Sequence, residues 1–170
     1  MTNSTFSTAV GTFAELQDDF VRLTTEIVWC TVATVDHEDR PRTRILHPYW
    51  EIDDGRPIGW VGTFRSPAKT AHLARNPYVS CSYWTPAHDA AFVDCRADWV
   101  GDANAKRRVW TLFASAPPPL GYDPRVSGWS DESDPLFQVL RLDPWRVQVT
   151  LQDLAGGRVI GSSRVWHAPG

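Results

Sequence analysis

Lysine is scarce in this chain. Only Lys69 and Lys106 are found among 17 basic residues, and the formal net charge is −3. The chain therefore lacks the overall positive field that recruits nucleic acids or acidic membrane surfaces. Because arginine supplies nearly all the positive charge, each lysine calls for a local explanation.

Long apolar runs are also missing. No segment approaches the roughly 20 apolar residues of a membrane span. The first twenty residues lack the basic start and the continuous apolar stretch of a signal peptide. We therefore expect a cytoplasmic chain with no membrane partner and no nucleic-acid partner.

The cysteines number three and show no CxxC spacing. Cys30, Cys81 and Cys95 lie in strand-like runs, so we expect buried thiols rather than disulfides or metal ligands. If the hairpin formed by 78–85 and 90–101 turns symmetrically, Cys81 and Cys95 face one another across it.

The common phosphate-binding glycine motifs are absent. The chain contains neither GxxxxGK[ST] nor GxGxxG, which disfavours nucleotide hydrolysis and Rossmann-type dinucleotide binding. His47, His72, His88 and His167 do not stand in a nucleophile pattern with a cysteine or a serine. A cysteine–histidine hydrolase remains a minor alternative, since it requires a contact that only the fold can create.

What the chain does contain is a succession of strand-like runs. Its 170 residues are enough for one domain with a sizeable core, which we expect to cover 1–170 with the core at about 12–152. Hairpins rather than regular βαβ units predict a mainly β barrel with short α-helices. The expected strands are 27–35, 42–52 (interrupted at Pro48), 58–64, 78–85, 90–101, 137–152 and 158–167, and the expected helices are 12–24, 66–76 and 102–114.

Two of the helix starts carry clear signals. Thr12 followed by Glu15 forms a capping box. Ser66 and Pro67 place a hydroxyl at the N-cap and proline at the first helical position, and the helix should stop before Pro77.

The long segment 115–135 is rich in Pro, Gly and Ser. Loops of this length are usually functional or mobile. It carries Tyr122, Arg125 and Trp129, which could cover a pocket or pack against a partner subunit.

The segment TFRSPAK (63–69), together with RTR (42–44), has the composition of an oxyanion site. Such a site needs fixed cations, hydroxyl donors and the free N–H groups of a helix start. The alternative is a set of solvated charges on a barrel rim, and spacing alone does not separate the two. The candidate groups are Arg42, Arg44, Arg65, Lys69, Thr63 and Ser66.

The order of these motifs resembles a known family. RTRILH (42–47), Thr63, Lys69 six residues later and LARNP (73–77) follow one another as in the pyridoxamine 5'-phosphate oxidase-like flavin-binding split barrels. The resemblance extends over about residues 12–150, and it is the order and spacing together that make it specific.

The resemblance implies a six-stranded antiparallel split barrel that forms a homodimer, with FMN at each end of the interface. Arg42 and Lys69 would hold the phosphate, while the backbone around Ile45 and Leu46 would flank the flavin ring. The implied cofactor-binding residues are Arg42, Thr43, Arg44, Ile45, His47, Thr63, Phe64, Ser66 and Lys69.

The resemblance also implies a flavin-dependent oxidoreductase that transfers a hydride to or from a small organic substrate. The family's oxidases carry Lys at the position of His47, Arg at Ala68 and Gln at Ala91, so it does not imply pyridoxamine phosphate oxidation itself. Two alternatives stay open: a reductase of the same fold that uses the deazaflavin coenzyme factor 420, and a non-catalytic module that binds flavin or haem.

Overall fold

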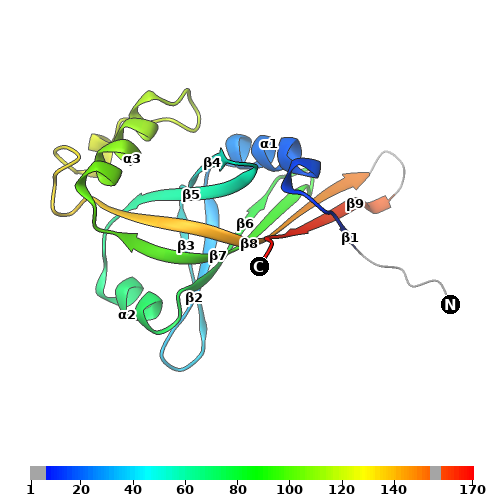
Figure 1. The fold of residues 1–170 in the computed structure, drawn as a ribbon, viewed down its shortest axis with the longest axis horizontal. Helices are drawn as coiled ribbons and strands as arrows, with labels where there is room; N and C mark the ends of the chain where they lie inside the picture. The colour runs from blue at the N-terminus through cyan, green and yellow to red at the C-terminus, as the bar shows by residue number, and fades with distance from the viewer. Residues whose placement is uncertain (1–6, 154–157) are drawn as a thin grey trace.

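The computed structural model describes residues 7–153 and 158–170 and is mainly β, with helices on the outside of a strongly curved sheet (Figure 1). Its strands are β1 (Thr8–Ala9), β2 (Cys30–Val35), β3 (Pro41–Leu46), β4 (Tyr49–Asp53), β5 (Arg56–Thr63), β6 (Tyr78–Trp84), β7 (Ala90–Val100), β8 (Gln138–Asp153) and β9 (Arg158–His167). Its helices are α1 (Gln17–Ile27), α2 (Pro67–Arg75) and α3 (Ala103–Ser115), with short 3-10 turns η1 (Phe13–Glu15) and η2 (Pro124–Ser127).

The sheet closes on itself through one bent strand. Its order is β1-β9-β8-β7-β6-β2-β3, and β5 pairs with both β8 and β4. Only His47 and Pro48 separate β3 from β4, so one continuous segment pairs with β2 at one edge and with β5 at the other. The predicted interruption at Pro48 is confirmed, because proline cannot donate a ladder hydrogen bond.

The fold class predicted from the sequence is confirmed. With β3 and β4 taken as one bent strand, β2, β3–β4, β5, β6, β7 and β8 form an antiparallel barrel of the expected six strands. The predicted further strand is β9, which pairs with the second half of β8. The two-residue β1, parallel to β9, was not predicted, because two residues are too few to show a period.

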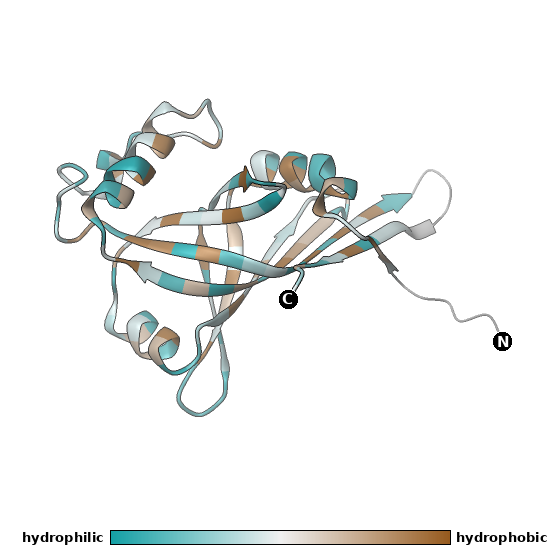
Figure 2. Ribbon diagram, in the orientation of Figure 1, coloured by the Kyte–Doolittle hydropathy of each residue, from teal (hydrophilic) through white to brown (hydrophobic). Residues whose placement is uncertain are grey.

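The main core lies between the barrel and α1. Phe13, Leu16, Phe20 and Leu23 recur at helical spacing and are all fully buried. Along β2 and β6, buried and more exposed residues alternate. Figure 2 shows that the strands carry both hydrophobic and hydrophilic residues along their length. This period of two is the signature of strands with one face on the core.

The N-terminal helix differs in detail from the prediction. Glu15 accepts a hydrogen bond from the Thr12 N–H at 2.9 Å, but the turn it caps is 3-10, and the α-helix proper follows it. That helix continues to Ile27, so β2 begins at Cys30 rather than at 27. The β-branched Ile27 and Val28 favoured a strand in the sequence, whereas in the structure Ile27 ends the helix and Val28 is its C-cap.

A second, smaller core forms under α3 and the segment 115–135. Trp129 in that segment is buried against Phe137, at a ring-centroid distance of 5.0 Å. The long segment is therefore anchored to the barrel. The buried members of this cluster are Trp60, Val109, Phe113, Trp129, Phe137 and Val139.

The cysteine register predicted for the hairpin is wrong. Cys81 pairs with Val93, and Cys95 pairs with Val79. A direct Cys81–Cys95 pair would require a turn centred on residue 88. The turn between Trp84 and Ala90 is centred on residue 87, so the residue opposite Cys81 is Val93, two positions before Cys95. All three cysteines are buried free thiols, as expected.

In residues 7–153 and 158–170, no helix is long and apolar enough to cross a membrane. The same residues contain no group of three or more His, Cys, Asp or Glu side chains arranged to hold a metal ion.

Candidate functional site

The N-terminus of α2 forms as the sequence predicted. Ser66 is the N-cap, its hydroxyl accepts a hydrogen bond from the Lys69 backbone N–H at 3.4 Å, and Pro67 occupies the first helical position. Lys69 is therefore the third residue of the helix, with its cationic side chain in the turn where the helix dipole favours anions.

The Lys69 side chain is turned inward. Its Nζ donates to Thr63 Oγ1 at 2.6 Å and to the Phe64 carbonyl at 2.9 Å, and the residue is only 6% exposed. The Trp99 ring lies 5.8 Å from Nζ, at a distance where its π face attracts a cation. Burial, followed by the charge of Arg44, lowers the pKa of Lys69 from 10.5 to about 8.

Arginines from β3 extend this positive region. Arg44 pairs with Val32 of β2, and its charge reaches Lys69. Burial and the neighbouring Arg42 lower the pKa of Arg44 in turn. No carboxylate pairs with Lys69 or Arg44 among the residues that the structure describes, so two partly desolvated cations lack a counter-charge.

The remaining predicted cations are placed differently. Arg42 is largely exposed and lies 3.8 Å from the Asp36 carboxylate. The Arg65 guanidinium stacks on Trp99 at 5.1 Å from the ring centroid. Arg42 thus has a local partner that Arg44 lacks.

A cavity of about 320 Å³ adjoins this region on the side of α3. The predicted residues Ile45, His47, Thr63 and Phe64 all line it. The remaining walls come from the residues just before β2, from β3 and β5, and from the segment 115–135, which the sequence marked as one that could cover a pocket. They are Val28, Trp29, Leu46, Gly62, Pro119, Tyr122, Val126, Ser127 and Trp129.

His47 is a buried polar side chain on the wall of the cavity. Its ring packs against Trp29, Phe113 and Tyr122, each with a centroid 5.2 Å away. Burial lowers the pKa of His47 to about 4, and a hydrogen bond to the Leu120 backbone opposes this only in part. The imidazole is therefore neutral at physiological pH, and its Nε2 is buried without a hydrogen-bond partner.

The backbone beside the cavity is strained. Val28 adopts φ 65° and ψ −62°, a left-handed conformation that is rare for a β-branched residue. The Trp29 N–H donates to the Ile27 carbonyl at 2.7 Å and closes a γ-turn around Val28. Such strain tends to occur at functional sites. Here it turns Trp29 outward, where its ring is 59% exposed.

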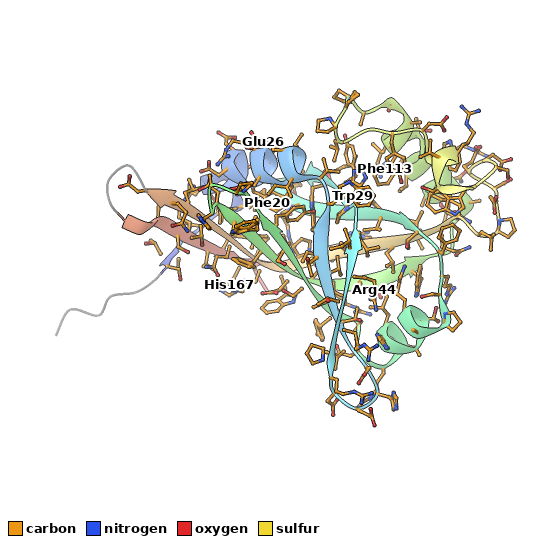
Figure 3. All side chains as sticks on the ribbon, turned by 180° about the vertical axis from the view of Figure 1, so that it is seen from behind. Phe20, Glu26, Trp29, Arg44, Phe113 and His167 are labelled. Atoms are coloured by element: carbon orange, nitrogen blue, oxygen red, sulfur yellow. The ribbon has the colours of Figure 1, made fainter. Side chains whose placement is uncertain are left out.

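The structure thus divides the predicted residues into two adjoining groups. Figure 3 shows Trp29 and Phe113 toward the α3 end and Arg44 farther along the sheet, toward α2. Thr63 joins the two groups, because it lines the cavity and accepts from Lys69. Thr43 is exposed on β3 and belongs to neither group.

Sequence reasoning did not name Val28 and Trp29 as site residues. Nothing in IVWCTVATV marks a γ-turn, so the only available signal was the surplus of tryptophan. Tyr122 and Trp129 were noted in the long loop, and the structure places both on the cavity.

Comparison with known proteins finds similarity in structure but not in sequence. No family model matches the chain, and no curated protein matches it. Solved structures do match over most of its length, at low identity.

A protein related to general stress protein 26, of the pyridoxinephosphate oxidase family, from Clostridium acetobutylicum superposes with a TM-score of 0.63 at 13% identity, covering 79% of this chain and 87% of that one. A pyridoxamine 5'-phosphate oxidase-related, FMN-binding protein from Nostoc punctiforme gives 0.59 at 11% identity, covering 95% and 98%. The haem storage protein HutZ from Vibrio cholerae gives 0.55 at 17% identity, covering 76% and 89%. The chain therefore has the split-barrel fold of the pyridoxamine 5'-phosphate oxidase-related proteins, as the resemblance of its motifs predicted.

Proposed function

We propose that this chain is a flavin-dependent oxidoreductase that binds FMN, with the phosphate at the start of α2 and the ring toward the aromatic cavity. The observation that carries the proposal is Lys69, a residue only 6% exposed whose ammonium group no described carboxylate neutralises. A buried charge without a partner is costly, and a bound phosphate would remove that cost.

The donor set fits a phosphate ester. Lys69 and Arg44 supply charge, and the helix start supplies the Ala68 N–H and a favourable dipole. Hydrogen bonds between ionised donors and phosphate are among the strongest in proteins. Arg42 completes the set that the resemblance implies, although in this structure it is shared with Asp36.

The ring end of the site is apolar and aromatic. Ile45 is 60% exposed and Phe64 is 46% exposed, and both line the cavity, so they offer an aliphatic and an aromatic surface to a flavin ring. A bound flavin would supply the hydride chemistry, while the protein binds it, orients it and excludes water. The deazaflavin coenzyme also needs a phosphate site and an apolar surface for its ring, so it stays an alternative cofactor.

The homodimer is also part of the proposal. Trp29, Tyr78, Trp84 and Trp145 are large apolar residues left 44–59% exposed on or beside the sheet. Apolar side chains of this size are enriched in interfaces. We propose that a second copy covers this face and completes the ring end of the site.

The test begins with the purified protein and its absorption spectrum, followed by titration with FMN and with the deazaflavin coenzyme. We expect a flavin spectrum with perturbed bands, and loss of that spectrum in Lys69→Ala. Lys106→Ala is the matched control, because Lys106 lies on α3 against Phe137. A protein that takes up neither flavin contradicts the proposal.

A non-catalytic binding module is the second candidate. The likeness in fold to a haem storage protein favours this candidate. Mixing the flavin-loaded protein with NAD(P)H or reduced deazaflavin distinguishes the two. A coloured protein that no electron donor reduces supports the module.

A further inference from the structure

Two cations from either side of the Ser66 N-cap lie over one indole ring, that of Trp99 on β7. The Arg65 guanidinium carbon is 5.1 Å from the ring centroid, and Lys69 Nζ is 5.8 Å from it. Both distances fall within the roughly 6 Å over which the quadrupole of a ring attracts a cation, and indole is the strongest of the protein rings in this respect. Trp99 is therefore an electrostatic neighbour of the proposed phosphate site.

The sheet holds Trp99 in place. Residue 99 pairs with Leu140 of β8, and its side chain packs against the main hydrophobic core. A side chain carried by a strand is positioned more precisely than one carried by a loop. Arg65, by contrast, is exposed in the connection between β5 and α2. The Trp99 ring thus gives the start of α2 a fixed surface on which its cations lie.

No carboxylate performs this task. In residues 7–153 and 158–170, no acidic side chain pairs with Lys69 or Arg65. The groups that face Lys69 from the surrounding elements are the Arg44 cation, the Thr63 hydroxyl, the Phe64 carbonyl and the Trp99 ring.

A ring and a carboxylate have different consequences for an anion site. A carboxylate would stabilise the cations, but it would also cancel the charge that attracts a phosphate. An aromatic ring attracts a cation through its quadrupole and carries no net charge. Stabilisation by Trp99 therefore leaves the full positive charge of Lys69 and Arg65 available to a ligand.

We infer that Trp99 is a positioning residue of the phosphate site: its ring, in place of a carboxylate, stabilises the charged forms of Lys69 and Arg65 and so preserves their charge for a phosphate. The inference rests on the proposed function, because the FMN phosphate is the anion that it names. It also adds Arg65 to the cations that act at the start of α2.

A cation–π role and a packing role of Trp99 predict opposite changes at Lys69. If the ring only shields Lys69 from water, a smaller side chain admits water and raises the pKa of Lys69. If the π face stabilises the ammonium group, loss of the ring lowers that pKa. The direction of the change therefore separates the two roles.

The chain allows this change to be measured directly, because Lys69 and Lys106 are its only lysines. With carbon-13 at lysine Cε, NMR follows two signals from pH 6 to pH 10 in the full chain without added flavin, and Lys106→Arg assigns them. The wild-type Lys69 signal should change near pH 8. Its midpoint should fall by about half a pH unit in Trp99→Leu and by less in Trp99→Phe, which keeps a weaker π face.

Two controls accompany this titration. The Lys106 midpoint should stay the same in both Trp99 variants, because Lys106 lies against Phe137 instead. Trp110→Leu is the matched tryptophan variant, since Trp110 lies on α3 and its ring packs on Phe137 at a centroid distance of 5.1 Å. It should leave the Lys69 midpoint unchanged.

Phosphate binding supplies the second readout. Inorganic phosphate is titrated at pH 7 and detected by the shift of the Lys69 signal. Trp99→Leu and Arg65→Gln should each weaken its binding about threefold. The double variant should be weaker by less than the product of the two effects, because Arg65 has already lost its ring in Trp99→Leu.

Two outcomes overturn the inference: a Lys69 midpoint that rises or stays the same in Trp99→Leu, and effects of Trp99→Leu and Arg65→Gln on phosphate binding that multiply fully. If Trp99→Leu does not fold, the direction of the change in Trp99→Phe still decides. The proposed function can fail separately. The expected order of Lys69 midpoints in a protein that takes up no flavin would support the role of Trp99 and contradict FMN binding, whereas FMN uptake with a raised midpoint would do the reverse.

Discussion

Two buried nitrogen bases lie at opposite ends of the site and respond differently to the same physical effect. Burial lowers the pKa of Lys69 to about 8 and that of His47 to about 4. At neutral pH the lysine is therefore still charged and needs an anion, whereas the histidine is neutral and offers a lone pair. One effect, applied to groups of different basicity, produces a cationic end and an uncharged end.

The largest expected effect concerns His47 and acid stability. Its pKa is lower in the folded protein than the ordinary 6.5, so the unfolded chain binds more protons between pH 6.5 and 4. Stability is full above pH 6.5 and falls as the pH approaches 4, by about 3 kcal/mol from this residue. Urea unfolding of the wild type and of His47→Phe at pH 7 and pH 4.5 measures the part of this loss of unfolding free energy that His47 causes.

The control for that comparison is His37→Asn, because His37 is exposed in the turn between β2 and β3. His37→Asn should keep the wild-type loss of stability on acidification, and His47→Phe should reduce it. Equal acid sensitivity in wild type and His47→Phe would show that the imidazole is not held neutral by the fold.

The second effect concerns the cationic end. Lys69→Ala should weaken FMN binding by about 1.5–3 kcal/mol, the range for hydrogen bonds to charged groups, while Lys106→Ala should leave it unchanged. Flavin fluorescence titration gives both affinities. If Lys69→Ala bound FMN as tightly as the wild type does, the phosphate would lie elsewhere. The site would then have no cationic end at Lys69 to contrast with the uncharged end at His47.

The third effect is a loss of FMN affinity at alkaline pH, whereas the effect at His47 is a loss of stability at acidic pH. A bound phosphate restores the charged form of Lys69, so binding takes up a proton above pH 8. Between pH 7 and 8 the FMN phosphate, with a second pKa of about 6, is already a dianion, so FMN affinity should be nearly flat there and fall by up to about tenfold per pH unit above pH 8. Lys69→Arg keeps its charge throughout and should remove the fall. If FMN affinity in Lys69→Arg still fell above pH 8 as in the wild type, the proton taken up on binding would belong to a group other than Lys69.

The sequence predicted the cationic end better than the aromatic one, for a physical reason. Ser66, Pro67 and Lys69 act within a single helical turn, and the N-cap they form depends on local geometry alone. The aromatic cavity brings Trp29, His47 and Trp129 together from three distant segments, and no local pattern specifies that contact.

The fold shows the same contrast. The barrel strands followed from strand-like runs separated by turns, and Pro48 marked the bend. By contrast, the hairpin register depended on where the turn after Trp84 is centred, and the end of α1 depended on packing. One residue of difference in the turn was enough to separate Cys81 from Cys95.

The smallest expected effect tests how Arg44 and Lys69 are coupled. Arg44 lowers the pKa of Lys69, so Arg44→Ala should move the pH at which FMN affinity falls to a higher value. The same change should weaken binding at pH 7 by about 1.5 kcal/mol or less. Arg42→Ala is the matched comparison, because Arg42 acts on Arg44 and Asp36 instead. Arg42→Ala should weaken FMN binding without moving the pH at which the affinity falls. If that pH shifted equally in both variants, the pKa of Lys69 would respond to the total charge of the region rather than to Arg44 in particular.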